Sequence, residues 1–460
     1  MTRTCDLLVV GGGAGGLVAA REARRRGAST ILVQDGRVGG DCTFTGCIPS
    51  KALLAGAARG SSFAEAMGSV TAAVERIAAT EDATALARDG IEVVDGWAKV
   101  VAPDAVEVDG TRIGGRHLVI ATGSRPAIPP IPGLVEAAPL TNETLFELRT
   151  RPDSLTILGG GPMGCEMAQA FARLGTAVTL VESADRILPR EEPDTSAVLA
   201  DVLASDGITV ITGAVVERVE RSADGTAQLH LADGSVVETD QVLVAAGRVL
   251  SGRGIGLEEL GVEIDERGAI VVDASMATAT KGIWAVGDVT GGLALTHVAG
   301  RQGWIAASNA LGKAARIRRF RFDPSLVPWA VLTSPEVGRV GLTEAEAAAA
   351  HPSARVAHLD LAHVDRAVAT GDERGFVKLI AAPRPGIRHL GGGRIIGASV
   401  VAPTGGDLVH EAALAMQTGM MAGRLAQTTH AYPSWAMAIQ QAALQFFGPS
   451  AGGEARTVRG

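Results

Sequence analysis

The sequence predicts an α/β protein with two Rossmann-like dinucleotide-binding domains and a C-terminal α+β domain, and three observations support this fold class. A buried strand runs into a glycine-rich turn and a helix near the start of the chain, and the arrangement recurs from Leu155. In both copies a second strand ends 23 positions after the first glycine, from Gly11 to Gln34 and from Gly159 to Glu182. From about Asp323 onward, strands and helices alternate without a nucleotide-binding turn.

The composition limits the classes of protein to which the chain can belong. Its 460 residues are enough for about two to four domains, and 42 basic against 50 acidic residues give a net charge of −8. Because there is no basic block, neither nucleic acid nor an anionic membrane is an expected partner. No apolar run approaches the roughly 18 residues of a membrane span, and the chain starts with a strand-like segment instead of a signal peptide. We therefore expect a cytoplasmic protein.

The first glycine-rich turn follows the first strand. Gly11, Gly13 and Gly16 have the spacing of a dinucleotide-binding turn, which brings backbone N–H groups at a helix N-terminus to a pyrophosphate. An acidic ribose-binding residue is expected at the end of the next strand, but the chain has Gln34 there, followed by Asp35. Both side chains can bond a ribose, so the sequence leaves open which of them does so.

Two cysteines, Cys42 and Cys47, lie five positions apart directly before an expected helix. Pro49 suits a first helical turn, so Cys47 is expected at or just outside the helix N-terminus. Free backbone N–H groups favour a thiolate there by up to about 2 kcal/mol. The alternative is a pair of buried structural cysteines, which the selective residues around the pair argue against. With only four cysteines in the chain, the usage is that of a reducing compartment with a catalytic disulfide.

The segment between the two repeats closes the first domain. Apolar residues at helical spacing over 61–88 precede short strands, and Asp109-Gly110 has the signature of a hairpin turn. The buried strand at 118–121 then ends in Thr122 and Gly123, small residues that let the backbone approach a ligand closely.

The second glycine-rich turn contains Gly159, Gly161 and Gly164, so the chain is expected to bind a second dinucleotide. Glu182 ends the following strand, where a carboxylate bonds both ribose hydroxyls and repels a 2′-phosphate. The nearest cation, Arg186, lies four residues further on. The sequence therefore favours NADH over NADPH as the nicotinamide nucleotide, although NADPH stays open.

A second hairpin and a closing strand complete this repeat. Asp233-Gly234 supplies the hairpin turn, and the closing strand ends in Gly247, which we assign to the nucleotide site.

The stretch from Cys42 to Lys51 resembles the redox-active motif of the flavoprotein disulfide reductases, the family of dihydrolipoyl dehydrogenase, glutathione reductase and mercuric reductase. The resemblance implies FAD in the first domain and NAD(P)H in the second. It also implies that Cys42 meets the substrate, that Cys47 forms the charge-transfer thiolate against the flavin, and that Lys51 lies beside the flavin. Glu166 stands where the family places a partner for that lysine; the alternative is a solvated helix residue.

The resemblance extends over essentially the whole chain. It implies that Asp288, after the strand near 283–286, binds the ribitol hydroxyls, and that backbone near Ala98 binds the adenine. The implied domains are an FAD-binding domain in two parts, an NAD(P)-binding domain between them and a C-terminal dimerisation domain of a homodimer. Their residues are 1–150 and 271–325 for FAD, 151–270 for NAD(P) and 326–460 for dimerisation.

The chain departs from this family at the proton-transfer site. In the family the dimerisation domain supplies a histidine with a supporting glutamate, but here Tyr432 and Met437 occupy these positions. A tyrosine is only about 0.1% phenolate at pH 7, so Tyr432 is a poor base and oxidation of dihydrolipoamide should be slow. His430 is an alternative base, and simple packing at the interface is an alternative role for Tyr432.

The resemblance implies an FAD-dependent enzyme that passes electrons from NAD(P)H through Cys42 and Cys47 to a disulfide or another thiol-reactive acceptor. Alternatives are a metal-ion reductase similar to mercuric reductase, a dihydrolipoyl dehydrogenase and a low-turnover flavoprotein redox sensor. Mercuric reductases carry a C-terminal cysteine pair, whereas the last cysteine here is Cys165. No resident metal site is predicted, and the sequence does not identify the acceptor.

Overall fold

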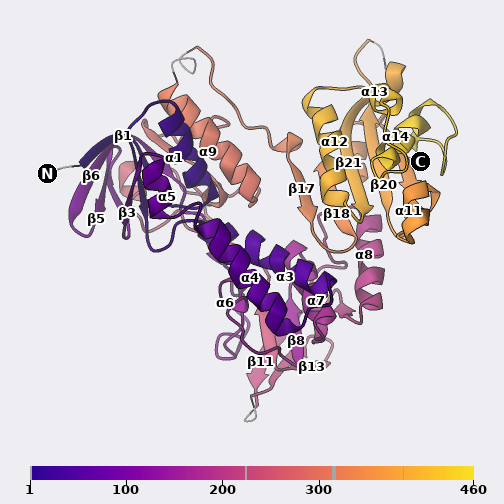
Figure 1. Cartoon of the computed structure of the whole chain (residues 1–460), viewed down its shortest axis with the longest axis horizontal. Coiled ribbons are helices and arrows are strands. Elements are labelled where there is room, and N and C mark those ends of the chain that lie inside the picture. Colours follow the sequence, from indigo (N-terminus) through magenta and orange to yellow (C-terminus); the bar gives the residue numbers. More distant parts are fainter. Residues whose placement is uncertain (1–2, 223–224, 313–316, 387, 460) are drawn as a thin grey trace. The chain divides into compact units, whose positions relative to one another are not determined.

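The structure is a computed structural model (Figure 1). It divides into two compact units, each formed from two segments of the chain. Unit 1 comprises Met1–Pro152 and Gln241–Asp323, and unit 2 comprises Asp153–Asp240 and Pro324–Gly460. The residues that the structure describes are 3–222, 225–312, 317–386 and 388–459.

Residues 241–270 lie in unit 1, although the motifs place them with the second nucleotide-binding segment. The compact units therefore differ at these residues from the domains that the motifs predict. The predicted division of the chain into four segments stays a prediction.

Unit 1 combines one large sheet with helices on it. Its elements are β1 (Arg3–Val10), α1 (Ala14–Arg25), β2 (Thr30–Gln34), α2 (Gly40–Phe44), α3 (Cys47–Ala58), α4 (Phe63–Ala78), α5 (Ala83–Arg88), β3 (Ile91–Asp95), β4 (Lys99–Ala102), β5 (Ala105–Val108), β6 (Thr111–Ile120), β7 (Ser124–Pro126), α6 (Asn142–Leu145), β14 (Gln241–Val244), β15 (Arg248–Leu250), η1 (Glu258–Leu260), β16 (Ile283–Ala285), η2 (Asp288–Thr290) and α9 (Thr296–Leu311).

The strand order of the large sheet is β3-β2-β1-β6-β5-β4, with β16 also paired to β6. The pairs β1–β2, β1–β6, β2–β3 and β6–β16 are parallel, whereas β4 and β5 form an antiparallel extension. Alternate residues of β1 enter different cores, because successive side chains of a strand point to opposite faces. Leu7 and Val9 pack with α1 and α9, which lie side by side in Figure 1, while Leu8 and Val10 pack with β5 and β6.

Unit 2 contains the second glycine-rich turn and the C-terminal α+β domain. Its elements are β8 (Ser154–Leu158), α7 (Pro162–Arg173), β9 (Ala177–Val181), α8 (Pro193–Ser205), β10 (Thr209–Ile211), β11 (Val216–Arg221), β12 (Ala227–Leu231), β13 (Val236–Thr239), η4 (Pro324–Leu326), β17 (Pro328–Val331), β18 (Glu336–Gly341), α10 (Glu344–Ala350), β19 (Arg355–Asp360), η5 (Leu361–His363), α11 (Asp365–Thr370), β20 (Phe376–Ala382), η6 (Leu390–Gly392), β21 (Arg394–Ala402), α12 (Gly405–Gln417), α13 (Ala422–Gln427), α14 (Met437–Leu444), η7 (Gln445–Phe447) and β22 (Arg456–Thr457).

Three sets of strands organise unit 2. Strands β8, β9 and β10 lie side by side in parallel, and β11, β12 and β13 form an antiparallel meander. The C-terminal sheet is antiparallel in the order β17-β18-β21-β20-β19-β22, and α12 packs on β18 and β21 (Figure 1).

A buried charge cluster ties the start of α8 to this C-terminal sheet. Lys378 on β20 is 4% exposed, and its Nζ lies 2.7 Å from Asp194, 3.4 Å from Glu192 and 3.4 Å from Glu344. Burial opposes the charge on Lys378, but the carboxylates outweigh it and raise the pKa of the ammonium group. The second nucleotide-binding segment and the C-terminal sheet are therefore joined through groups that depend on one another for charge neutralisation.

Both predicted hairpins are confirmed. Asp109 and Gly110 join β5 to β6 with positive φ at both positions, and Gly234 lies in the turn between β12 and β13. Helix α14 begins at Met437, and the residues directly before it form turns.

Candidate functional site

The two predicted redox cysteines lie on consecutive helices. Cys42 is on the short helix α2, and Cys47 is the first residue of the 12-residue helix α3, so its expected place at a helix N-terminus is confirmed. The backbone N–H groups of a helix's first turn stabilise negative charge. The arrangement therefore suits a thiolate on Cys47.

The two sulfur atoms differ electrostatically. Contact with Cys47, together with burial, strongly raises the pKa of the Cys42 thiol. Cys42 therefore keeps its proton when Cys47 carries the negative charge. The Sγ atom of Cys47 also lies 3.1 Å from Oγ1 of Thr296, the first residue of α9.

The first glycine-rich turn is set by two close backbone approaches. Gly11 has φ +104°, and a Cβ atom there would lie 2.3 Å from the carbonyl oxygen of Ala121. A Cβ atom on Gly16 would lie 1.9 Å from the carbonyl oxygen of Gly11. Only glycine fits at either position, so α1 begins directly against the end of β1, with its N-terminus available to an anion.

Gln34 and Asp35, the two residues predicted to bind the ribose, are held against this turn. Gly12 N donates to Oε1 of Gln34 at 2.6 Å, and Nε2 of Gln34 donates to the carbonyl oxygen of Asp35 at 2.6 Å. The Gln34 amide thus makes the contact with the turn that a carboxylate could make, but it carries no negative charge. This places Gln34 and Asp35 together at the ribose end of the turn.

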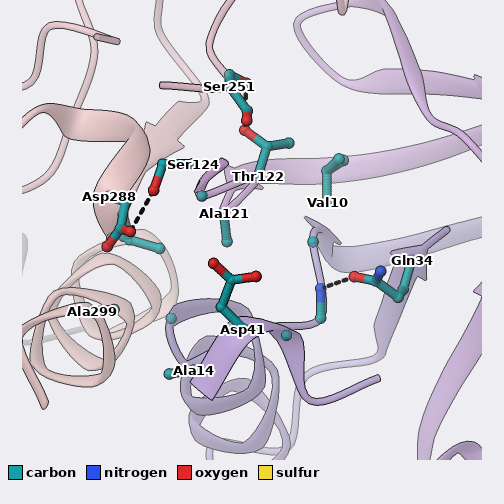
Figure 2. A pocket seen from close by; sticks show the side chains of 18 of the residues that line it. Val10, Ala14, Gln34, Asp41, Ala121, Thr122, Ser124, Ser251, Asp288 and Ala299 are labelled. Carbon is teal, nitrogen blue, oxygen red and sulfur yellow. Dashed lines mark hydrogen bonds between the residues drawn. The ribbon is translucent and has the colours of Figure 1, made fainter. Parts of the chain in front are cut away.

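These features border one cavity of about 490 Å³, within the usual range of small-molecule sites. In Figure 2 the Asp41 side chain points into it, between Asp288 on one side and Gln34 on the other. Of the predicted residues of unit 1, only Gly16, Lys51 and Gly247 lie outside the lining. The predicted residues that line it are Gly11, Gly13, Gln34, Asp35, Cys42, Cys47, Ala98, Thr122, Gly123 and Asp288.

The cavity therefore fits the FAD that the resemblance implies. A glycine turn at a helix N-terminus suits a diphosphate, and polar side chains at the strand ends suit a ribose and a ribityl chain. The two cysteines reach the same cavity from α2 and α3, so a dinucleotide bound there meets the sulfur pair.

An ion-pair network that the sequence analysis did not identify also lines the cavity. Arg248 bonds the Asp41 carboxylate, donates to Oγ of Ser124 at 2.6 Å and lies 3.5 Å from the Asp288 carboxylate. Ser124 in turn donates to Asp288 at 2.6 Å, as Figure 2 shows. Arg248 therefore compensates two carboxylates that would otherwise repel a bound diphosphate. The sequence signal was an arginine directly after the glycine that ends a buried strand.

The second glycine-rich turn repeats the first in detail. Gly159 has φ +114°, and a Cβ atom on Gly164 would lie 1.9 Å from the carbonyl oxygen of Gly159. Gly160 N donates to Oε2 of Glu182 at 2.6 Å, matching the bond between Gly12 and Gln34. The predicted internal repeat is thus a repeat of the same backbone geometry, with a carboxylate in the second copy.

The negative charge of the Glu182 carboxylate dominates at the end of β9, because the nearby cation is turned away from it. Its Oε1 accepts from Ala184 N at 2.8 Å, which fixes the side chain. Arg186 is turned toward its own loop, where Nη2 donates to the carbonyl oxygen of Pro189 at 2.9 Å and Nη1 lies 3.4 Å from Asp185.

The remaining nucleotide-site residues have distinct surroundings. Glu166 on α7 is 4% exposed and accepts from Leu332 N at 2.8 Å, so it is not a solvated helix residue. Lys51 lies on α3, one turn after Cys47. The pairing of Lys51 with Glu166 stays a prediction. Gly247, with φ +133°, links β14 to β15 in unit 1.

The predicted proton-transfer position is occupied by an exposed tyrosine. Tyr432 is 71% exposed, and a hydrogen bond to the Asp365 carboxylate raises the pKa of its hydroxyl group. A raised pKa makes the phenolate still rarer at neutral pH, which strengthens the expectation that Tyr432 is a poor base. Met437 begins α14.

His430, the alternative base, is held within its own domain. Its Nε2 lies 3.0 Å from Oε1 of Glu411, its Nδ1 lies 2.9 Å from the carbonyl oxygen of Thr428, and its side chain is 7% exposed. Both ring nitrogens are thus engaged by acceptors, an arrangement that suits a structural role better than proton transfer to a substrate.

Neither a metal site nor a membrane-spanning helix is present in the described ranges. Within these ranges, no group of three or more His, Cys, Asp and Glu side chains is arranged to hold a metal ion. Over the same part of the chain, none of the helices combines the length and apolar character needed to cross a lipid bilayer.

Comparisons with protein families match both units. The model described as pyridine nucleotide-disulphide oxidoreductase matches residues 5–303, and the dimerisation domain model of the same name matches residues 327–443.

Curated relatives and solved structures are similar over almost the entire chain. A mercuric reductase from Streptomyces lividans is 37% identical over 466 aligned residues, which cover 96% of each protein. A dihydrolipoyl dehydrogenase from Thermus scotoductus (strain ATCC 700910 / SA-01) is 35% identical over 463 residues, covering 96% of this chain and 97% of the relative. A Cu(II) complex of the HOCl-induced flavoprotein disulfide reductase RclA from Escherichia coli has a TM-score of 0.88 at 29% identity, covering 96% of this chain and 99% of that chain.

Proposed function

Because the chain belongs to the pyridine nucleotide-disulphide oxidoreductase family, we propose that it passes electrons from NADH through Cys42 and Cys47 to a disulfide or another thiol-reactive acceptor. Members of this family are FAD-dependent enzymes that use NAD(P)H, so the predicted family, enzyme class and cofactors are confirmed. The observation that supports the proposal most is that both cysteines line the same cavity as the first dinucleotide turn.

Bound FAD supplies the two-electron link between the nicotinamide and the sulfur pair. Reduction of the Cys42–Cys47 disulfide takes up two electrons and one proton, leaving a thiol and a thiolate. The helix N-terminus at Cys47 and the raised pKa of Cys42 favour the charge on Cys47 and the proton on Cys42. With a disulfide acceptor, Cys42 loses its proton to solvent and attacks one sulfur atom, which releases the first product thiolate. Cys47 then attacks the sulfur of Cys42, which re-forms the Cys42–Cys47 disulfide and releases the second product thiolate.

The cofactor pocket is held together by this chain's own polar groups. Gln34 and Asp35 are proposed to hold the ribose of FAD, and Asp288 its ribityl hydroxyls, with Arg248 compensating the charge of Asp288 and Asp41. The glycine turn binds the diphosphate through backbone N–H groups.

The residue at the proton-transfer position limits which classes of electron acceptor suit this site. Tyr432 is exposed and its pKa is raised, so an acceptor that needs little help from a base suits this site better than the oxidation of dihydrolipoamide. Reduction of a thiol-reactive metal ion is a second candidate function, favoured by the similarity to a mercuric reductase and by the dithiol's affinity for soft ions.

The working form is proposed to be a homodimer. Residues 327–443 match the family's dimerisation domain, and within this range the large side chains of Leu414 and Tyr432 are exposed in the single chain. In the dimer, Tyr432 is proposed to approach the sulfur pair of the partner subunit.

The proposal is tested by NADH oxidation with a panel of disulfides, quinones and metal ions. Cys42→Ser and Cys47→Ser should each lower the rate with disulfides by more than about 100-fold, because the atoms that meet or resolve the acceptor are removed. Cys5→Ser, in β1, is the matched control and should leave the rate unchanged. Disulfide reduction that survives both active-site substitutions would contradict the proposal.

The nucleotide preference is a second prediction. kcat/KM should be higher with NADH than with NADPH, since the Glu182 carboxylate repels a 2′-phosphate and Arg186 is turned away. Glu182→Gln keeps the bond to Gly160 but removes the charge, so it should shift the ratio of the two kcat/KM values toward NADPH by about 10-fold. Glu217→Gln, exposed on β11, should leave the ratio unchanged. A wild-type preference for NADPH would refute this assignment.

The third prediction concerns the missing base. Tyr432→His combined with Met437→Glu should raise dihydrolipoamide:NAD oxidoreductase activity by about 10-fold to 100-fold, the low end of the effect of a general base. Both changes are needed, because a histidine without the carboxylate lacks a partner that orients its ring. Tyr432→Phe should change this activity little. Loss of activity in Tyr432→Phe would show that the tyrosine already acts in proton transfer.

A further inference from the structure

We propose that the Thr296 hydroxyl belongs to the catalytic machinery, where it donates a hydrogen bond to the thiolate that Cys47 holds after reduction of the disulfide. The inference rests on the proposed function, since it assigns a further residue to the same sulfur pair. Its role is to keep the negative charge of the reduced pair on Cys47.

The contact itself is direct. Oγ1 of Thr296 lies 3.1 Å from Sγ of Cys47, a hydrogen-bonding distance, although the two residues are 249 positions apart in the chain. A thiolate can only accept a hydrogen bond, so with charge on Cys47 the threonine must be the donor. A hydrogen bond to a charged group is strong enough to move a titration midpoint by about one pH unit or more.

Thr296 also reaches the second sulfur atom. Contact with Cys47 and burial raise the pKa of Cys42, and the Thr296 hydroxyl acts in the opposite direction. The hydroxyl can thus serve either sulfur, while the larger effects keep the proton on Cys42. The charge that the Thr296 hydroxyl stabilises is therefore the charge on Cys47.

The fold fixes the hydroxyl in place. Thr296 is the first residue of the 16-residue helix α9, and Cys47 is the first residue of α3, so two helix N-termini converge on one sulfur atom. Helix α9 packs along α1, the helix that begins at the glycine turn. The hydroxyl, the sulfur pair and the cofactor cavity are therefore parts of one packed assembly within unit 1.

Other charged and titratable groups lie on the elements that carry the sulfur pair and Thr296, or act on Cys42. Asp41 is on α2, Lys51 on α3, and His297 and Arg301 are on α9, while Glu81 follows α4. Glu81 bonds Thr43 beside Cys42 and adds to the raised pKa of Cys42. None of these groups changes in a Thr296 variant, so a shift in the titration of Cys47 reports on the hydroxyl alone.

The test measures the thiolate without turnover. The full-length, flavin-loaded protein is reduced anaerobically with a phosphine, and alkylation of Cys42 and Cys47 by iodoacetamide is followed separately by peptide mass spectrometry from about pH 5 to pH 10. Thr296→Val keeps the shape of the side chain and should raise the alkylation midpoint of Cys47 by about one pH unit. Thr296→Ser keeps the hydroxyl and should stay within about 0.3 unit of wild type.

An unchanged midpoint in Thr296→Val, or an equal shift in Thr296→Ser, would overturn the inference. Bound flavin and the midpoint of thermal unfolding, measured on the same samples, establish that each variant is folded. If the two active-site serine variants lose disulfide reduction while Thr296→Val titrates like wild type, the inference fails and the proposed function stands. If those serine variants keep disulfide reduction, the proposed function itself fails.

Discussion

The site depends on a backbone contact that leaves no room for a side chain. The carbonyl oxygen of Gly11 occupies the place of a Cβ atom on Gly16, which seats α1 directly against the end of β1. The Gly39-Gly40 segment then packs on the same turn, since a Cβ atom on Gly40 would lie 2.7 Å from Cα of Gly13. Helix α2, which contains Cys42, begins at Gly40. The close approach that builds the proposed diphosphate site therefore also brings Cys42 to it.

Charge compensation is the second requirement of this arrangement. The glycine turn of the cavity suits an anion, yet the cavity also contains the carboxylates of Asp41 and Asp288. Arg248 and Ser124 hold these carboxylates in place. Negative charge is also limited in the sulfur pair. One helix N-terminus offers stabilisation to Cys47, whereas Cys42 is buried beside it and keeps its proton. In the proposed reduced state, the sulfur pair thus holds one negative charge instead of two.

The sequence predicted the features that are encoded locally. Glycine spacing, hairpin turns and the helix start at Cys47 depend on residues within one turn or strand, and the repeat supplied a second copy of the same signal. Contacts between distant segments were not predictable. Arg248 meets Asp41 across 207 positions, and Thr296 meets Cys47 across 249, because the chain returns to unit 1 only after the segment Asp153–Asp240. No local pattern specifies which side chains such a return brings together.

The central claim is that Cys42 and Cys47 form a redox-active pair in electronic contact with the flavin. Anaerobic titration of the purified, flavin-loaded protein with dithionite counts the electrons taken up per flavin. The account predicts about four electrons, two for the flavin and two for the disulfide, and about two in Cys47→Ser. Uptake of only two electrons by the wild-type protein, with its cysteines shown to be unmodified, would contradict the claim.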